Sequence, residues 1–197
     1  MHLSIGSVRQ WHWVSAAVTL VGMLMFAVTG ITLNHAADIR GNTQVISIEA
    51  EIPESELEVL RPLPAGEIML PATLRSYLNN YGVNITGHEL GQWDGIEFYI
   101  AMPKPGADAW LAIDTQLAHF SYERADRGWV AYFNDLHKGR DAGVVWFWFI
   151  DIFALFCVIF CSTGLILLFR QGPHRPMTWP IIALGALVPI VIILVFI

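Results

Sequence analysis

Three long apolar stretches, almost free of charged side chains, constrain what this chain can fold into. They cover residues 11–33, 143–169 and 177–197, and the only formal charge inside them is Asp151. A helix needs about 20 apolar residues to cross a hydrocarbon core of ~30 Å, so each stretch is long enough to span a membrane. The sequence therefore predicts an α-helical membrane protein with three transmembrane helices.

The first apolar stretch could also be a secretory signal peptide. Arg9 precedes it, and residues 35–37 (HAA) resemble a cleavage site. However, the stretch is longer than the roughly 7–15-residue core of a signal peptide. We therefore expect a retained membrane anchor.

Charged residues concentrate between the first two apolar stretches. Residues 36–142 hold sixteen of the seventeen acidic and eight of the eleven basic residues, a formal charge of −8. This acidity argues against nucleic acid or anionic lipid as a partner and permits attraction of cations. We predict three parts: residues 1–35 with the first transmembrane helix, a domain over residues 36–142, and residues 143–197 with the last two helices.

The charged domain has mixed secondary-structure signals. Short apolar and alternating segments predict strands, and one segment with helical spacing, residues 70–81, predicts a helix that ends before Gly82. The expected strands are 43–52, 96–102, 109–113 and 119–124. Together they predict an α+β domain with a helix packed on a small antiparallel sheet.

Basic residues beside the apolar stretches predict the orientation. Arg9 precedes the first stretch, and Arg170 and Arg175 lie in the short turn between the second and third. The positive-inside bias places both regions in the cytoplasm, so the α+β domain faces outward. In a bacterium this means an inner-membrane protein whose soluble domain lies in the periplasm.

Four of the seven histidines lie at predicted membrane boundaries. His12 and His174 lie at the inner side, and His35 and His137 at the outer side. Imidazoles from neighbouring helices at one depth are what a six-coordinate b-type haem needs. His12 and His35 are 23 residues apart in the sequence, about 35 Å along a helix, and cannot serve one haem.

The predicted haem pairs therefore join histidines at one face. His35 with His137 would hold an outer haem, and His12 with His174, or with His12 of a second copy, an inner one, giving one or two haems per chain or dimer. Solvated interfacial histidines are the ordinary alternative. Candidates for packing against haem are aromatic residues near these boundaries: Trp13, Tyr132, Trp146 and Trp148.

Two further features lie in the apolar stretches. A pair of small residues, Thr-Gly, occurs in two of these stretches, at Thr29-Gly30 and at Thr163-Gly164. Close helix packing alone would explain this internal echo, the weak similarity between the two stretches. Asp151 is a carboxyl at membrane depth, which is costly unless it is hydrogen-bonded or functional. It is either a protonated structural residue or one that moves protons or binds a haem-linked water.

Several stretches together resemble the PepSY-associated transmembrane family, including its small haem-bearing ferric reductases. Residues 9–13 (RQWHW) resemble the start of the family's first helix, and residues 29–35 (TGITLNH) resemble its end. Residues 135–140 (DLHKGR) and 162–165 (STGL) resemble the entry and exit of the next helix. The intervening domain resembles a PepSY-like α+β unit in outline.

This resemblance implies b-type haem in the inner membrane, ligated by His12, His35 and His137. It implies electron transfer to periplasmic ferric iron or ferric siderophores from a donor that the sequence does not name. With three helices, a homodimer would help to wall haem away from membrane lipid. No hydrolytic or nucleotide-binding motif occurs in the sequence, so no catalytic side chain is predicted. The rival functions are a non-enzymatic accessory or inhibitory binding module and a small transporter.

Overall fold

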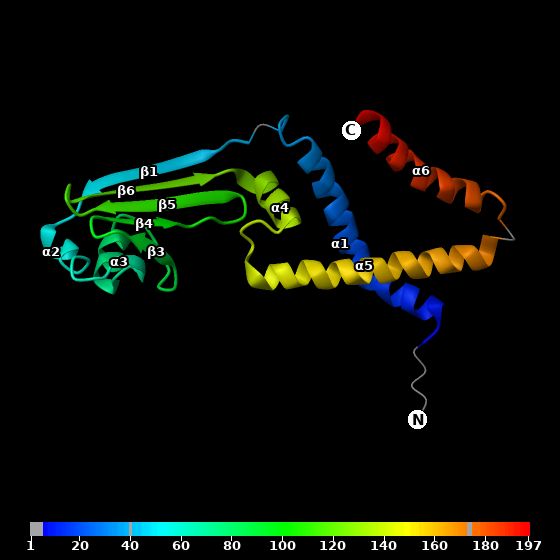
Figure 1. Cartoon of the computed structure of the whole chain (residues 1–197), viewed down its shortest axis with the longest axis horizontal. Helices are drawn as coiled ribbons and strands as arrows, with labels where there is room; N and C mark the ends of the chain where they lie inside the picture. The colour runs from blue at the N-terminus through cyan, green and yellow to red at the C-terminus, as the bar shows by residue number, and fades with distance from the viewer. Residues whose placement is uncertain (1–5, 40, 173–174) are drawn as a thin grey trace, which may run out of the picture. The chain divides into compact units, whose positions relative to one another are not determined.

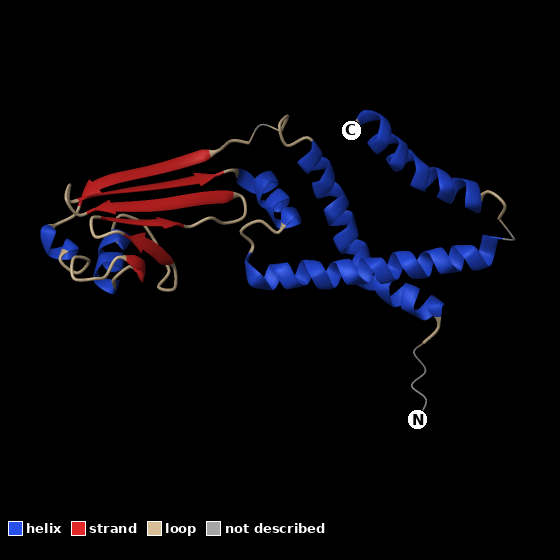
Figure 2. Ribbon diagram, viewed as in Figure 1, coloured by secondary structure: helices blue, strands red, loops and turns tan. Residues whose placement is uncertain are grey.

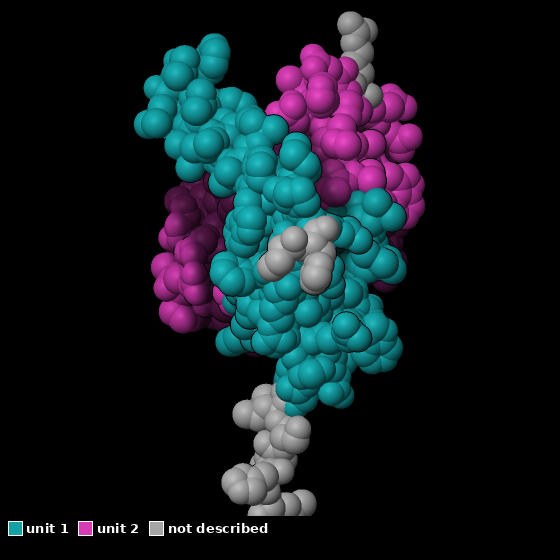
Figure 3. All heavy atoms as spheres, turned by 90° about the vertical axis from the view of Figure 1, so that its right-hand side faces the viewer, with its two compact units in different colours: residues 1–25, 148–197 teal, residues 26–147 magenta. Residues whose placement is uncertain are grey.

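The computed structural model of the protein describes residues 6–39, 41–172 and 175–197. The chain forms two compact units, coloured separately in Figure 3. Unit 1 comprises Met1–Met25 and Trp148–Ile197, and unit 2 comprises Phe26–Phe147. Both boundaries fall inside long helices, so each unit contains part of α1 and part of α5.

Three helices are long and apolar enough to cross a membrane: α1 (Val8–Asn34), α5 (Gly143–Gln171) and α6 (Thr178–Phe196). Most of their side chains are exposed in the isolated chain, as expected of helices whose surroundings are lipid. The predicted class, a helical membrane protein with three spans, is confirmed.

Unit 2 is built on one antiparallel sheet with the strand order β1-β6-β5-β4-β3-β2 (Figures 1 and 2). The strands are β1 (Gln44–Glu51), β2 (Gly66–Met69), β3 (Leu90–Trp93), β4 (Glu97–Ala101), β5 (Ala107–Asp114) and β6 (His119–Asp126). The four longest coincide with the predicted strands. The four-residue β2 and β3 were missed, because such short strands leave little periodicity to read.

One face of the sheet is covered by α2 (Glu54–Leu57) and α3 (Ala72–Asn79). Leu74 and Leu78 of α3 pack in a core with Phe98 and Leu111 of the sheet. Because side chains alternate along a strand, the residues between these core positions point to the opposite, open face. The predicted α+β domain, with a helix on an antiparallel sheet, is confirmed.

A helix that the sequence analysis did not predict, α4 (Gly128–Lys138), lies between β6 and α5. It ends at Gly139, whose left-handed φ of 68° lets the Arg140 N–H reach the Asp135 carbonyl oxygen. The terminal glycines and the weak helix formers Asn134 and Asp135 obscured this helix. The signal that could have revealed it is the spacing of its apolar residues: Trp129, Tyr132, Phe133 and Leu136.

Within unit 1, α1 and α5 approach closely where a glycine faces an aromatic ring. A β-carbon placed on Gly22 would overlap the Phe153 ring. Small residues permit such close helix contacts, and in lipid these contacts must supply the packing energy that the hydrophobic effect supplies in water. On α6, Trp179 packs edge-on against Phe169 of α5, with ring centroids 5.1 Å apart.

We expect Gly22→Val to weaken the contact between α1 and α5. The added side chain has no room beside Phe153, so the overpacking should cost about 1–3 kcal/mol. Thermal unfolding of the detergent-solubilised protein measures the loss. Gly185→Val on α6 is the matched control, since no atom lies near a β-carbon there. Equal destabilisation by both variants would contradict this account of the contact.

Candidate functional site

The imidazole of His12 lies against one face of α5, within unit 1. Its Nδ1 is 3.1 Å from the Thr163 hydroxyl and 3.2 Å from the Phe160 carbonyl oxygen. The His12 ring stacks on the Phe160 ring with centroids 4.8 Å apart and planes inclined by 12°. A β-carbon on Gly164 would lie 3.2 Å from His12 Cε1, so the ring fits there because residue 164 has no side chain. We call this group of residues the His12 site.

The imidazole of His137 meets a similar face of α1, within unit 2. His137 lies in the last turn of α4, and its Nδ1 is 2.6 Å from the Thr29 hydroxyl. The Phe26 ring lies 4.8 Å from it, tilted by 51°. Gly30 lies beside Cε1, where a β-carbon would be 3.9 Å away. We call this group the His137 site.

The two sites are built on one sequence pattern. Residues 26–30 and 160–164 both read Phe-x-x-Thr-Gly, and the spacing of three and four residues puts the phenylalanine, threonine and glycine on one helical face. In each case a histidine from another helix lies on that face, with its Nδ1 at the threonine hydroxyl. The internal echo in the sequence is therefore a repeated helix face on which a histidine packs.

Hydrogen-bond partners assign the protonation of both imidazoles. At the His12 site, the Phe160 carbonyl can only accept, and the Thr163 hydroxyl already donates to the Ile159 carbonyl at 2.7 Å. Nδ1 of His12 must therefore carry the proton. At the His137 site, the Thr29 hydroxyl lies 3.1 Å from the Phe26 carbonyl oxygen and 2.6 Å from His137 Nδ1, and by analogy with the His12 site we place the proton on Nδ1 of His137.

This assignment leaves the lone pair of each neutral imidazole on Nε2. Neither Nε2 has a hydrogen-bond partner within the part of the chain that the structure describes. A histidine that binds a metal through one nitrogen usually donates its other N–H to a protein acceptor, which fixes the ring. The donor chemistry of His12 and His137 therefore fits axial ligation of a haem iron.

His35 lies just beyond the last residue of α1 and is exposed. Its Nδ1 donates to the Ile31 carbonyl of its own helix at 3.0 Å, so its Nε2 lone pair is also available. At about 100° per residue, His35 lies on the side of α1 opposite Phe26. Within the described residues the two imidazoles of His35 and His137 make no contact, and their sharing of one haem stays a prediction.

The other sequence candidates are spread over both units. His174 lies outside the described residues, so its pairing with His12 stays a prediction. Trp146 donates its Nε1–H to the Leu136 carbonyl at 2.8 Å and so ties α5 to the end of α4. The remaining candidates for packing against haem are exposed: Trp13, Tyr132 and Trp148.

Asp151 is exposed on α5. It lies nine residues before Phe160, which places the two side chains on roughly opposite sides of the helix. The carboxyl is therefore directed away from the His12 site. Among the described residues it has no ion-pair partner.

A buried carboxylate on α4 holds the helix that carries His137. Asp135, whose side chain is 3% exposed, accepts the Gly106 N–H at 2.9 Å and pairs with Arg127 at 3.0 Å and Lys138 at 3.2 Å. Burial, the largest influence, raises the pKa of Asp135, but the hydrogen bonds from Gly106 and Lys138 and the charge of Arg127 outweigh it. The pKa of Asp135 therefore lies below its usual value.

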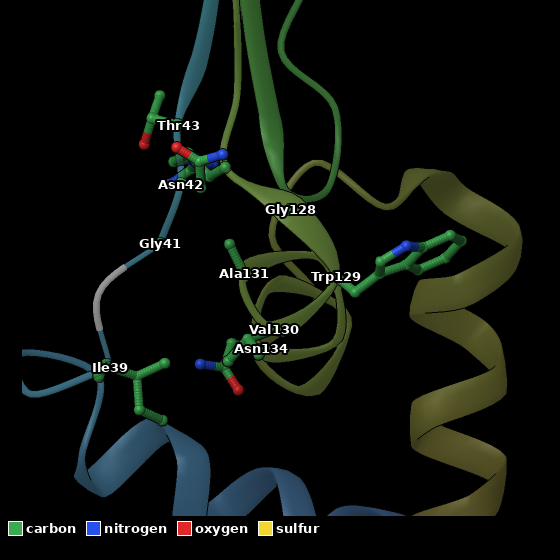
Figure 4. Close-up of a pocket in the computed structure, with 11 residues that line it drawn as sticks. Ile39, Gly41, Asn42, Thr43, Gly128, Trp129, Val130, Ala131 and Asn134 are labelled. Atoms are coloured by element: carbon green, nitrogen blue, oxygen red, sulfur yellow. The ribbon is translucent and has the colours of Figure 1, made fainter.

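A pocket of about 390 Å³ lies beside α4 in unit 2 (Figure 4). Its walls are the segment after α1 and the first turns of α4: Ala36, Ile39, Gly41, Asn42, Thr43, Arg127, Gly128, Trp129, Val130, Ala131 and Asn134. The Thr32 hydroxyl donates to the Asn134 side chain at 2.6 Å, which links the pocket wall to α1. Within the described residues no group of three or more metal-ligating side chains occurs.

The three apolar helices and the inserted antiparallel sheet domain define a helical membrane protein with an α+β domain. The chain belongs to the PepSY_TM-like family, whose sequence model matches residues 3–197. This match confirms the resemblance to the PepSY-associated transmembrane proteins. No curated protein and no solved structure matches the chain.

We expect Asp135→Asn to weaken the attachment of α4 and to flatten the pH dependence of stability. Because the pKa of Asp135 is lowered by folding, its contribution is complete above the ordinary carboxyl pKa of about 4 and is lost as the pH falls through the folded value. The variant should lose roughly 2–3 kcal/mol at pH 7, since a buried charged acceptor is removed.

Chemical unfolding from pH 7 to pH 3 measures this effect. Asp141→Asn is the control, because Asp141 is exposed and pairs only with its neighbour Arg140; it should change stability by less than about 1 kcal/mol. If the wild type and Asp135→Asn lose the same amount of stability between pH 7 and pH 3, the role assigned to Asp135 is contradicted.

Proposed function

We propose that this protein is an inner-membrane b-type haem protein that passes electrons to ferric iron or ferric chelates in the periplasm. The observation that carries the proposal is the repeated site in which an imidazole Nδ1 lies within hydrogen-bond distance of a threonine hydroxyl, while Nε2 has no hydrogen-bond partner among the described residues. Bound haem would supply one-electron redox chemistry. The family membership supports the membrane setting.

The chain's own residues would orient the ligands and shape the space around them. Thr163 and Thr29 fix the tautomer and ring plane of His12 and His137. Gly164 leaves room beside Cε1 of His12, whereas a β-carbon at residue 30 would be in ordinary contact with Cε1 of His137. Phe160 and Phe26 pack on the imidazoles and shield them, and apolar surroundings of this kind influence a haem's potential.

His12 and His137 lie near opposite ends of the membrane-spanning part, according to their places in the sequence and the proposed orientation. One ligand at each side suits a protein that accepts electrons at one face and delivers them at the other. A second imidazole to hold each haem would come from His35, from His174 or from a second copy of the chain. The electron donor would meet the cytoplasmic side.

The open face of the sheet offers an acidic surface to a cationic ferric substrate. A row of paired residues crosses four strands: Glu51 opposite His119, His119 opposite Asp114, and Asp114 opposite Glu97. Alternation along each strand directs these side chains away from the helix-covered core. Such a surface would raise the local concentration of a cation without binding it tightly.

We expect His137→Ala and His12→Ala each to lose bound haem. The full-length protein should be purified from haem-supplied cells, and the ratio of haem to chain measured together with the reduced-minus-oxidised spectrum. Each variant should lose haem or change from six-coordinate to five-coordinate iron, because a ligand nitrogen is missing. His88→Ala, an exposed histidine in the α+β domain, is the control and should keep the wild-type spectrum. Haem binding unaltered in both variants would overturn the ligand assignment, and a colourless wild type would favour the accessory-module function.

We also expect the threonines that hold the imidazoles to tune haem binding. Thr163→Val or Thr29→Val removes the acceptor of an Nδ1–H and should weaken haem affinity about 10–100-fold, the usual effect of losing such a support. Haem titration into the apoprotein measures the change. Thr19→Val is a matched control, because the Thr19 hydroxyl donates to the Ser15 carbonyl of its own helix at 2.8 Å and not to a histidine. If all three valine variants behave alike, the hydrogen bond to the imidazole has no special role.

A further inference from the structure

Helix α4 carries an apolar face that the chain leaves uncovered. Trp129, Tyr132, Phe133 and Leu136 follow the spacing i, i+3, i+4 and i+7 and share one side of the helix. Trp129 is 77% exposed, Phe133 39% and Tyr132 37%. The three aromatic rings pack on one another, with centroids 5.4–6.3 Å apart. We call these four residues the aromatic face of α4.

The other side of α4 is used by contacts within unit 2. Asn134 accepts the Thr32 hydroxyl, and Asp135 accepts the Gly106 N–H. In Figure 4 the Trp129 ring extends away from Ala131 and Asn134, which lie on the other side of the helix. The polar side of α4 is thus fixed to the chain, and the aromatic face points outward.

The contacts of α4 with α1 place it close to a membrane boundary. The 27 residues of α1 measure about 40 Å, so a helix that spans a ~30 Å core extends about 5 Å beyond it at each end. Thr29 and Phe26, which contact His137, lie about 7 and 12 Å from the end of α1. The last turn of α4 therefore lies at, or just inside, the hydrocarbon boundary.

We propose that the aromatic face of α4 inserts into the lipid interface at the outer side of the membrane. Tryptophan and tyrosine favour this region, where the ring enters the apolar layer and the polar atom stays hydrated. The same contact removes from water an aromatic cluster that a soluble domain would rarely expose.

This contact has a consequence for His137. The helix that carries the imidazole is held by the sheet through Asp135 and by α1 through Asn134, and the lipid interface adds a third attachment. These three attachments together fix the depth of His137 in the membrane. The proposal rests on the span of α1 and the contacts of α4, and it holds whether or not haem is bound.

Spin-label accessibility in full-length protein tests the proposal. Nitroxides are attached at Trp129→Cys, Ala131→Cys and Leu117→Cys in a Cys157→Ala, Cys161→Ala background, and the proteins are reconstituted into phosphatidylcholine vesicles. The label at residue 129 should meet oxygen, which dissolves in lipid, severalfold more often than a water-soluble nickel chelate. Leu117, 75% exposed in the turn between β5 and β6, should show the reverse. Ala131, which lines the pocket on the opposite side of α4, should meet oxygen less often than residue 129.

Two results would overturn the proposal. Nickel access at residue 129 equal to that at residue 117 would show that the face is in water. Low access to both reagents at residue 129 would show that the face is covered by protein, either a second copy of the chain or another partner. Phe133→Cys provides a second labelling position on the same face if the Trp129 variant does not fold, and it must give the same lipid-exposed result.

Discussion

One contact occurs twice in this protein: an imidazole Nδ1 at a threonine hydroxyl, which we assign as an Nδ1–H donated to that hydroxyl. Each threonine lies in an apolar helix and uses its own hydroxyl proton on a carbonyl of the preceding turn, so only its lone pairs remain for the histidine. The bond thus fixes the tautomer of His12 and His137 and leaves the lone pair of each imidazole on Nε2. Both imidazoles are half-buried, and the free Nε2 is where a ligand would be expected.

Helix α4 connects this chemistry to the rest of unit 2. Its last turn joins a buried carboxylate network at Asp135 to the imidazole at His137, two residues apart. Gly139 then ends the helix with a left-handed residue, and α5 begins at Gly143. Each residue of the Leu-His-Lys-Gly segment has a distinct role here: the Leu136 carbonyl accepts from Trp146, Lys138 pairs with Asp135, and Gly139 stops the helix.

Sequence reasoning located the spans and the long strands, because uncharged runs and strict alternation are strong local signals. It also singled out His12 and His137. It did not find α4, whose aromatic spacing is interrupted by Asn134 and Asp135. Nor could it tell that the Thr29-Gly30 and Thr163-Gly164 pairs receive histidines. Such contacts join residues more than a hundred positions apart, and no local pattern encodes which face of one helix meets which side chain of another.

Electron paramagnetic resonance of the ferric wild-type protein, purified in full length from haem-supplied cells, tests the central claim most directly. If His12 and His137 bind haem iron through Nε2, with a second imidazole completing each site, the spectrum should be that of low-spin iron between two neutral imidazoles. A high-spin signal alone, or no haem signal in protein given ample haem, would contradict the account.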